Sequence, residues 1–272
     1  MKYQPYNYPS LTKSYKGIYP FKIGTTSFIY PDHYIPNIKM LGPYMDEIEL
    51  LFFESRGTEA LPSRTVISEL CRLAGEFDLS YNVHLPTDIS ISDEDPARQQ
   101  CAVETLIRIM ELVRPLDASA LILHAPYSEK SYDENLVENW RDRVYQNLAK
   151  ITSTVGMQDI IALETLDYPL ELLEDIVLDL DLGICLDLGH LMVYDYDLIK
   201  VFNKYSFKTS IIHLHGVENN RDHTTLDQLS EKLASCVLQI LKRFTGVVSL
   251  EVFSFENLSS SLKFLENHWQ EN

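Results

Sequence analysis

Residues 183–191, "GICLDLGHL", join an apolar run to a carboxylate and an imidazole. The run ends at Asp187, and His190 follows three residues later. Two interpretations fit this pattern: a strand that ends in a helix cap with an exposed histidine beyond it, or a metal site at the end of a buried strand. The predicted fold and the other polar residues of the chain decide between them.

Eight short β-rich runs recur along the chain, and the apolar run at 182–188 is the sixth of them. Several are almost continuously apolar, which is typical of parallel strands that are covered on both faces. The eight runs are "FKIGTTSF" at 21–28, "DEIELLFF" at 46–53, "LSYNVHL" at 79–85, "ASALILH" at 118–124, "DIIALET" at 159–165, "LGICLDL" at 182–188, "TSIIHLH" at 209–215 and "GVVSLEVF" at 246–253.

The segments between the runs carry helical patterns. Residues 95–113 begin with an acidic residue and Pro96, as many helices do. Residues 226–244 place leucine, isoleucine and valine along one stripe. Eight β-then-α units in a chain of this length predict an α/β fold, the (βα)8 TIM barrel. A doubly wound open sheet would more often show a GxGxxG fingerprint after an early strand, and the chain has none.

The chain of 272 residues has no long Gly/Ser linker, so we expect a single barrel domain over residues 21–272. The Tyr-rich segment 1–20 lacks the apolar core of a secretory signal, and we expect an arm that packs on the barrel or helps to cover a ligand. No run approaches the roughly 18 apolar residues of a membrane span. The four cysteines form no CxxC pair, which favours reduced thiols and a cytoplasmic protein.

The formal net charge of −17 at pH 7 restricts the partners of the protein. A strongly acidic surface repels the phosphate backbone of DNA and RNA, so we expect no nucleic-acid partner. One phosphate held by a metal ion remains compatible with this charge. We therefore expect a small-molecule substrate.

Polar residues end one predicted strand after another, at the edge where barrel enzymes carry their chemistry. Taken alone, a histidine at a strand end is more often a core or rim residue, and an acidic residue there often caps a helix. Carboxylates gathered at one edge repel each other and are costly to bury without a cation. Carboxylate and imidazole ligands suit Zn, Mn, Fe or Co. The strand-end residues are His84, His124, Glu164, Asp187, His190, His213, His215 and Glu251.

His213 and His215 lie two residues apart on one strand, so their side chains point to the same side. We interpret one as a metal ligand and the other as its neighbour. The loop that follows, "GVENNRDHTTLD", adds Arg221, Asp222 and His223. This loop is either a solvated connection or a source of contacts to a phosphate or hydroxyl group above the metal.

The ordered set Glu164, Asp187-x-x-His190, His213 and Glu251 resembles the xylose isomerase-like barrels over nearly the whole chain. This superfamily includes sugar isomerases, ketose epimerases and the endonuclease IV type of apurinic endonuclease. The resemblance implies a core metal site formed by Glu164, Asp187, His213 and Glu251. His84, His124, His190 and His223 match positions that extend the site to several metals in the endonuclease branch. That branch usually has Asp-x-His after strand seven, whereas here Asp222 directly precedes His223, which argues against a full trinuclear site.

A narrower resemblance lies near the start of the chain. The segments "KIGTTSFIYPDHYIPNI" at 22–38 and "IELLFFES" at 48–55 are similar to those of the cobamide-remodelling phosphodiesterases. This resemblance implies a metal-dependent hydrolase that cleaves the nucleotide-loop phosphodiester of cobamides such as cobalamin. Tyr30 and Tyr127 would then either face the corrin ring or serve ordinary packing. We expect catalytic roles for Glu164, Glu251 and His190, and substrate contacts from His84, His124, His215, Arg221 and His223.

Two alternatives stay open at this stage. The first is a sugar or sugar-phosphate isomerase or epimerase, in which Glu164 and Glu251 move protons beside a metal-bound carbonyl. The second is a barrel that binds a metal or a corrinoid without catalysis. His84 and His124 favour phosphate chemistry because the sugar alternative does not require them.

Overall fold

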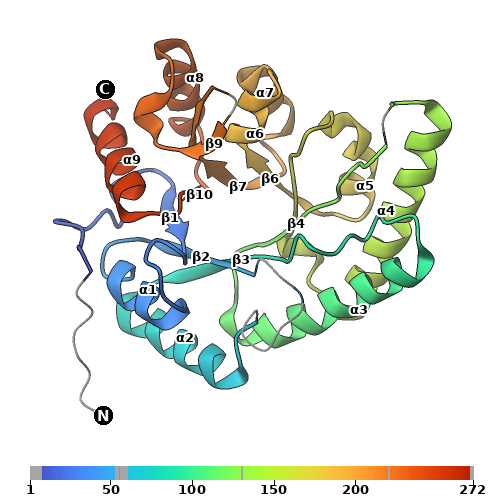
Figure 1. The fold of residues 1–272 in the computed structure, drawn as a ribbon, viewed down its shortest axis with the longest axis horizontal. Coiled ribbons are helices and arrows are strands. Elements are labelled where there is room, and N and C mark those ends of the chain that lie inside the picture. Colours follow the sequence, from blue (N-terminus) through green and yellow to red (C-terminus); the bar gives the residue numbers. More distant parts are fainter. Residues whose placement is uncertain (1–7, 53–54, 56–60, 130, 220, 270–272) are drawn as a thin grey trace.

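The computed structural model describes residues 8–52, 55, 61–129, 131–219 and 221–269, and these form a closed barrel of eight parallel strands (Figure 1). Each of the eight predicted runs contains one barrel strand, so the predicted (βα)8 fold is confirmed. Around the barrel the strand order is β1, β10, β7, β6, β5, β4, β3 and β2. The strands are β1 (Lys22–Thr26), β2 (Glu47–Leu51), β3 (Ser80–His84), β4 (Leu121–Leu123), β5 (Ile161–Glu164), β6 (Gly183–Asp187), β7 (Thr209–Leu214) and β10 (Val247–Leu250).

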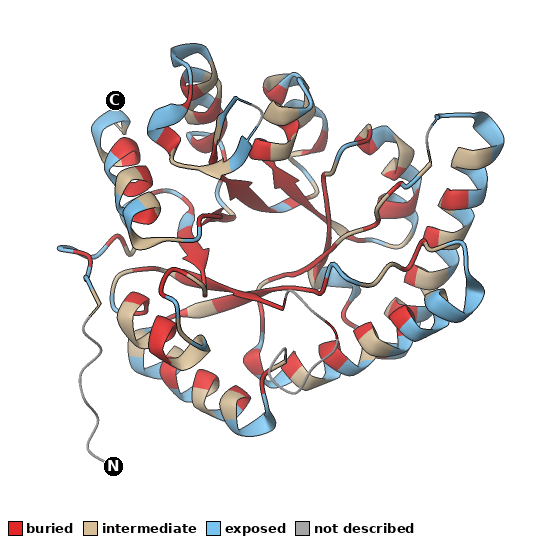
Figure 2. Cartoon of the chain, viewed as in Figure 1, coloured by how far each residue is buried: buried red, intermediate tan, exposed pale blue. Residues whose placement is uncertain are grey.

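Helices surround the barrel and turn their apolar stripes toward the strands (Figures 1 and 2). They are α1 (Tyr34–Leu41), α2 (Arg64–Phe77), α3 (Pro96–Val113), α4 (Glu134–Val155), α5 (Glu174–Asp179), α6 (Leu188–Val193), α7 (Leu198–Tyr205), α8 (Glu231–Leu241) and α9 (Phe255–His268). Short 3-10 turns are η1 (Arg114–Leu116), η2 (Gln158–Ile160), η3 (Leu170–Leu172) and η4 (Leu226–Gln228).

Two helix predictions had different outcomes. Residues 95–113 form α3 as predicted, with Asp95 accepting from the backbone of Ala97 and Pro96 in the first turn. The single helix expected over 226–244 was wrong in extent. The chain makes the turn η4 first, and α8 begins at Glu231 because the Ser230 side chain caps the backbone N–H of Leu233.

The charged segment after β7 is not a simple loop. It forms a two-stranded antiparallel hairpin of β8 (Gly216–Glu218) and β9 (Arg221–Thr224). Because β7 ends at Leu214, this hairpin stands at the carboxyl end of the barrel, above the strand ends that carry the polar residues (Figure 1).

The barrel interior has an apolar part and a polar part. Neighbouring strands in register place Ile122, Ala162, Cys185, Ile211 and Val247 in one buried apolar cluster. Residues two positions further along β5 and β7, Glu164 and His213, share the same face by strand alternation. The carboxyl end of the interior is therefore polar.

The described part of the N-terminal segment packs on the barrel. The Tyr8 ring stacks on Tyr30 at 4.8 Å, the backbone N–H of Tyr15 donates to Tyr44 O at 2.8 Å, and Tyr19 packs edge-on against Trp269 at 5.1 Å. Residues 1–7 of the predicted arm lie outside the described residues. The boundary between an arm over 1–20 and a domain over 21–272 stays a prediction.

Candidate metal centre at the carboxyl end of the barrel

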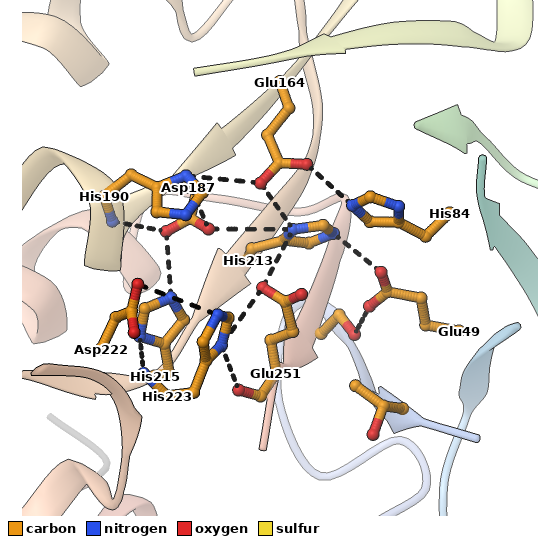
Figure 3. A network of polar contacts seen from close by, with 12 residues as sticks. Glu49, His84, Glu164, Asp187, His190, His213, His215, Asp222, His223 and Glu251 are labelled. Atoms are coloured by element: carbon orange, nitrogen blue, oxygen red, sulfur yellow. Dashed lines mark hydrogen bonds and ion pairs between the residues drawn. The ribbon is translucent and has the colours of Figure 1, made fainter. Parts of the chain in front are cut away.

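His213 lies at the centre of the polar cluster, and its Nδ1 faces three carboxylates (Figure 3). The distances are 3.4 Å to Glu164 Oε1, 3.4 Å to Glu251 Oε2 and 4.0 Å to Asp187 Oδ2. Register explains part of this arrangement, because Asp187 and His213 are direct partners on β6 and β7. All four side chains are buried. The structure thus brings together the four residues expected to bind a metal, and we name them the central cluster.

Two further histidines meet Glu164: His84 from the end of β3 and His124 from the residue after β4. His124 Nε2 lies 2.8 Å and His84 Nε2 3.1 Å from Glu164 Oε2. Glu164 therefore directs Oε1 to the central cluster and Oε2 to His84 and His124. The ligand atoms of these three residues are close enough to share one cation. We name His84, His124 and Glu164 the first flanking cluster.

His190, Asp222 and His223 form a second flanking cluster, whose ligand atoms lie within 4.8 Å of one another. Asp222 directly precedes His223, where the endonuclease branch usually has Asp-x-His, and this departure was expected to argue against a full trinuclear site. Consecutive strand residues normally point to opposite faces. His223, however, has a left-handed backbone with φ of 51°. This conformation breaks the alternation and lets both side chains face the site. The adjacent placement of Asp222 and His223 therefore does not stand against three metal positions.

Asp187, the carboxylate of "GICLDLGHL", uses its two oxygens differently. Its Oδ1 accepts the backbone N–H of His190 at 2.8 Å and so caps α6. Its Oδ2 has no hydrogen-bond partner among the described residues and faces the imidazoles of His190 and His213. One oxygen caps the helix while the other remains available, so the two interpretations are compatible.

The substrate contacts expected of His215 and Arg221 stay predictions, and the two residues lie in different surroundings. His215 is fully buried, with Nδ1 accepting the backbone N–H of His223 at 2.9 Å and Nε2 lying 3.3 Å from Asp187 Oδ1. These contacts favour a positioning role over a substrate contact. Arg221 is exposed on β9, next to Asp222 but outside all three clusters, so its proposed substrate contact rests on the sequence alone.

Tyr30 and Tyr127 are packing residues in this structure, which is the second of the two expectations for them. Tyr30 stacks on Tyr8, and its hydroxyl donates to Pro9 O at 2.7 Å. Tyr127 packs edge-on against Trp140, and its hydroxyl donates to Ser131 O at 2.6 Å. Both rings are buried.

Glu49 is a member of the site that the sequence analysis missed. It is fully buried on β2, with Oε1 3.2 Å from His213 Nε2 and Oε2 accepting from the Ser249 hydroxyl. A usable signal was present in "EIELL" at 47–51, where two glutamates share one face of a strand that is otherwise apolar. In a barrel strand, one of the two faces points into the interior.

Burial and neighbouring charges perturb the carboxylates in opposite directions. Burial opposes ionisation of Glu164, but the imidazoles of His124 and His213 outweigh it and hold the pKa well below its ordinary value. Burial raises the pKa of Glu251 well above its ordinary value; His213 opposes the rise, and the carboxylates of Glu49, Glu164 and Asp187 add to it. The two glutamates that face His213 Nδ1 therefore differ in how readily they ionise.

Unpaired polar atoms test whether these residues fit a metal. Buried side-chain nitrogens and oxygens normally have hydrogen-bond partners. Among the described residues, five buried atoms of His213 and the carboxylates around it have none: Glu49 Oε1, Asp187 Oδ2, His213 Nδ1 and Nε2, and Glu251 Oε2. Imidazole and carboxylate donors left open in this way are the ligands that divalent transition metals take. The residues fit a divalent metal ion.

No helix in the described part of the chain is both long and apolar enough to cross a membrane.

Several known proteins are similar to this chain. An uncharacterized protein of Methanocaldococcus jannaschii is 24% identical over 277 residues, which cover 95% of this chain and 92% of that protein. The structure of a D-tagatose 3-epimerase-like protein superposes with a TM-score of 0.75 at 21% identity, covering 91% of this chain and 96% of that one. Endonuclease IV from Thermus thermophilus superposes with a TM-score of 0.70 at 17% identity, covering 90% of this chain and 99% of that one.

Other matched structures are named as ketose 3-epimerases, including enzymes for L-ribulose and D-psicose. At these identities the structural matches show the fold alone. The sequence profile of the xylose isomerase-like TIM barrel family matches residues 38–268. That match spans most of the chain, and the protein therefore belongs to the xylose isomerase-like TIM barrel family.

Proposed function

We propose that the protein is a metal-dependent phosphodiesterase. The observation that carries this proposal is the juxtaposition of the central cluster with two flanking clusters, joined through Glu164 and His190. Epimerisation beside one cation needs only the central cluster. Adjacent cation sites are typical of phosphodiester hydrolysis, where both the attacking and the leaving oxygen need stabilisation.

The central cluster, Glu164, Asp187, His213 and Glu251, would hold one cation, and the two flanking clusters would hold others. Bound divalent cations supply Lewis acidity toward a phosphoryl oxygen and lower the pKa of water. The chain holds the ligands in place through contacts of its own: His84 Nδ1 contacts Leu85 O at 3.0 Å, and His190 Nδ1 contacts Thr165 O at 3.0 Å.

Glu251 is the group that we assign to proton transfer. Its Oε2 is buried and has no hydrogen-bond partner among the described residues, and its pKa is raised by burial and by the neighbouring carboxylates. A carboxyl group with a raised pKa holds its proton more readily than an ordinary carboxyl group, which suits general acid–base catalysis. Glu164, with its lowered pKa, stays ionised and keeps both oxygens directed at the clusters.

For the substrate, we propose the nucleotide-loop phosphodiester of a cobamide. The support is the resemblance of residues 22–38 and 48–55 to the cobamide-remodelling phosphodiesterases, together with the net charge of −17, which disfavours polyanionic nucleic acid. Residue 24 of this segment is part of β1, and Glu49 of the second segment contacts His213. The second segment therefore adjoins the site, whereas Tyr30 of the first packs against Tyr8.

The test is incubation of the purified protein with cobalamin under reducing conditions, with Zn, Mn, Fe or Co added in turn, followed by mass analysis of the products. We expect a corrinoid that has lost its nucleotide loop, and greatly reduced turnover with unchanged cobamide binding in Glu251→Gln. Cleavage of abasic DNA with cobamides untouched would contradict the substrate.

Sugar epimerisation is the second candidate, and the names of the matched structures favour it. The geometry that suits it is the placement of Glu164 and Glu251 at equal distances of 3.4 Å from His213 Nδ1, which would let two carboxylates move protons beside one cation. Conversion of a free ketose, with no phosphodiester cleaved, would establish this function instead. Tight cobamide binding without any product would favour the barrel that only binds its ligand.

A further inference from the structure

The two oxygens of Asp187 have different surroundings. Oδ1 accepts from the His190 backbone and lies 3.3 Å from His215 Nε2. Oδ2 has no hydrogen-bond partner among the described residues and lies 4.0 Å from His213 Nδ1. A carboxylate held through one oxygen in this way offers the other to a cation.

The tautomer of His215 follows from its neighbours. Two backbone atoms approach His215 Nδ1: the N–H of His223 at 2.9 Å and the carbonyl oxygen of Gly216 at 3.3 Å. The N–H can only donate and is the closer of the two, so Nδ1 acts as an acceptor and carries no proton. In the neutral imidazole the proton is then on Nε2, the nitrogen that faces Asp187.

Gly189 makes room for the His215 ring. A Cβ atom at position 189 would lie 1.8 Å from His215 Cε1 and 2.3 Å from Nε2, far inside van der Waals contact. The ring therefore occupies the space that any side chain at position 189 would need. His215 is fully buried, and it contacts Gly189 of α6 on one side and the backbone of His223 in the β8–β9 hairpin on the other.

We propose that His215 is a positioning residue through which the β8–β9 hairpin orients Asp187. The His223 N–H sets the tautomer, the proton on Nε2 faces Asp187 Oδ1, and Oδ2 is left for the cation. Gly189 of "DLGH" and His215 of "HLH" therefore depend on each other, because the His215 ring fills the space that a side chain at position 189 would need. This inference rests on the metal centre of the proposed function but not on its substrate.

Four variants test it. His215→Leu removes both polar contacts, whereas the amide of His215→Gln can accept from His223 and donate to Asp187. Gly189→Ala displaces the ring without changing a polar group. Gly75→Ala on α2 is the matched control, because a Cβ there meets no atom within 4 Å.

The affinity for Zn or Mn, measured by competition with a chromophoric chelator, should fall about 10–100-fold in His215→Leu and Gly189→Ala, as for other outer partners of metal ligands. His215→Gln should stay within a few-fold of the native protein, and Gly75→Ala should be unchanged. Thermal unfolding of each variant shows whether it is folded.

The second readout needs no metal. Imidazole nitrogen shifts of histidine-labelled metal-free protein should assign the Nε2–H tautomer to His215. An Nδ1–H tautomer, or native affinity in His215→Leu and Gly189→Ala, would overturn the inference. So would complete loss of one cation equivalent in His215→Gln, since His215 would then be a ligand. Native protein that binds no cation would instead overturn the metal centre of the proposed function.

Discussion

Glu47 and Glu49 are two buried glutamates on the same face of β2, yet they serve opposite ends of the barrel interior. Glu47, toward the amino end, accepts from Asn82 Nδ2 at 2.9 Å and from the hydroxyls of Ser80 and Ser119, and Lys22 Nζ lies 3.9 Å away. Glu49, toward the carboxyl end, leaves Oε1 without a hydrogen-bond partner among the described residues.

The difference separates an end whose buried carboxylate is satisfied by the chain from an end where buried polar atoms are open. At the amino end the buried carboxylate is matched by donors of the chain, as folding alone requires. At the carboxyl end unpaired donors and carboxylates gather around His213, at a cost to the folded state that a bound cation would offset. Open polar atoms, more than buried charge, distinguish the candidate metal centre.

The largest effect is expected at the central cluster. Asp187→Asn should weaken the tightest metal equivalent by more than about 100-fold, because it removes a ligand oxygen and not only an outer partner. Isothermal titration of metal-free protein measures this change. Glu47→Gln, a similar loss of charge at the opposite end, should titrate like the native protein. Equal losses in the two variants would mean that the two ends do not differ as described.

A smaller loss is expected from the partner of His213. Glu49→Leu should weaken metal binding about 10–100-fold, because His213 would lose the acceptor that faces its Nε2. Glu49→Gln keeps an acceptor oxygen and should lose less. The same titration measures both variants. If Glu49→Gln lost a whole metal equivalent, Glu49 would be a direct ligand and not a partner of one.

At the amino end we expect a substitution to lower the stability of the fold and to leave metal affinity unchanged. Glu47→Leu should lower the free energy of unfolding by about 1–3 kcal/mol per donor left unsatisfied, since Asn82, Ser80 and Ser119 would lose their acceptor. Denaturant unfolding of the metal-free protein measures this cost. The metal affinity of folded Glu47→Leu should equal that of the native protein. An unchanged midpoint of unfolding would show that water or a rearrangement replaces the missing acceptor.

The smallest effect is expected on the melting temperature when Glu251 at the carboxyl end is changed. Glu251→Gln should leave the metal-free protein as stable as the native one or raise its melting temperature by roughly 2–4 °C, equivalent to about 1 kcal/mol. The reason is that the substitution removes the cost of burying a carboxylate, to which Glu49, Glu164 and Asp187 add repulsion. Differential scanning calorimetry with and without metal measures it. The metal-induced rise in melting temperature should shrink in the variant, and a lower melting temperature without metal would contradict the account.

The apolar runs and the polar residues at their ends were sufficient to predict the barrel and the meeting of the central cluster at one end of it. Both are local properties: burial on two faces requires continuous apolar runs, and a closed parallel barrel gathers all carboxyl ends at one edge. The positions of Glu164, Asp187, His213 and Glu251 follow from that rule. The sequence pattern alone did not find the β8–β9 hairpin, because its charged residues have the composition of a solvated loop.

Only the tertiary structure decided which atoms of these residues are engaged and which are open. Glu49 belongs to the site because β2 turns that face inward toward His213, a contact between strands far apart in sequence. His215 became a neighbour of Asp187 because Gly189 leaves space and the hairpin supplies a backbone donor. The positions of strands can be predicted from local periodicity. The partner of each oxygen and nitrogen depends on how separate segments pack. That packing decides which oxygen of Asp187 is engaged and which is open.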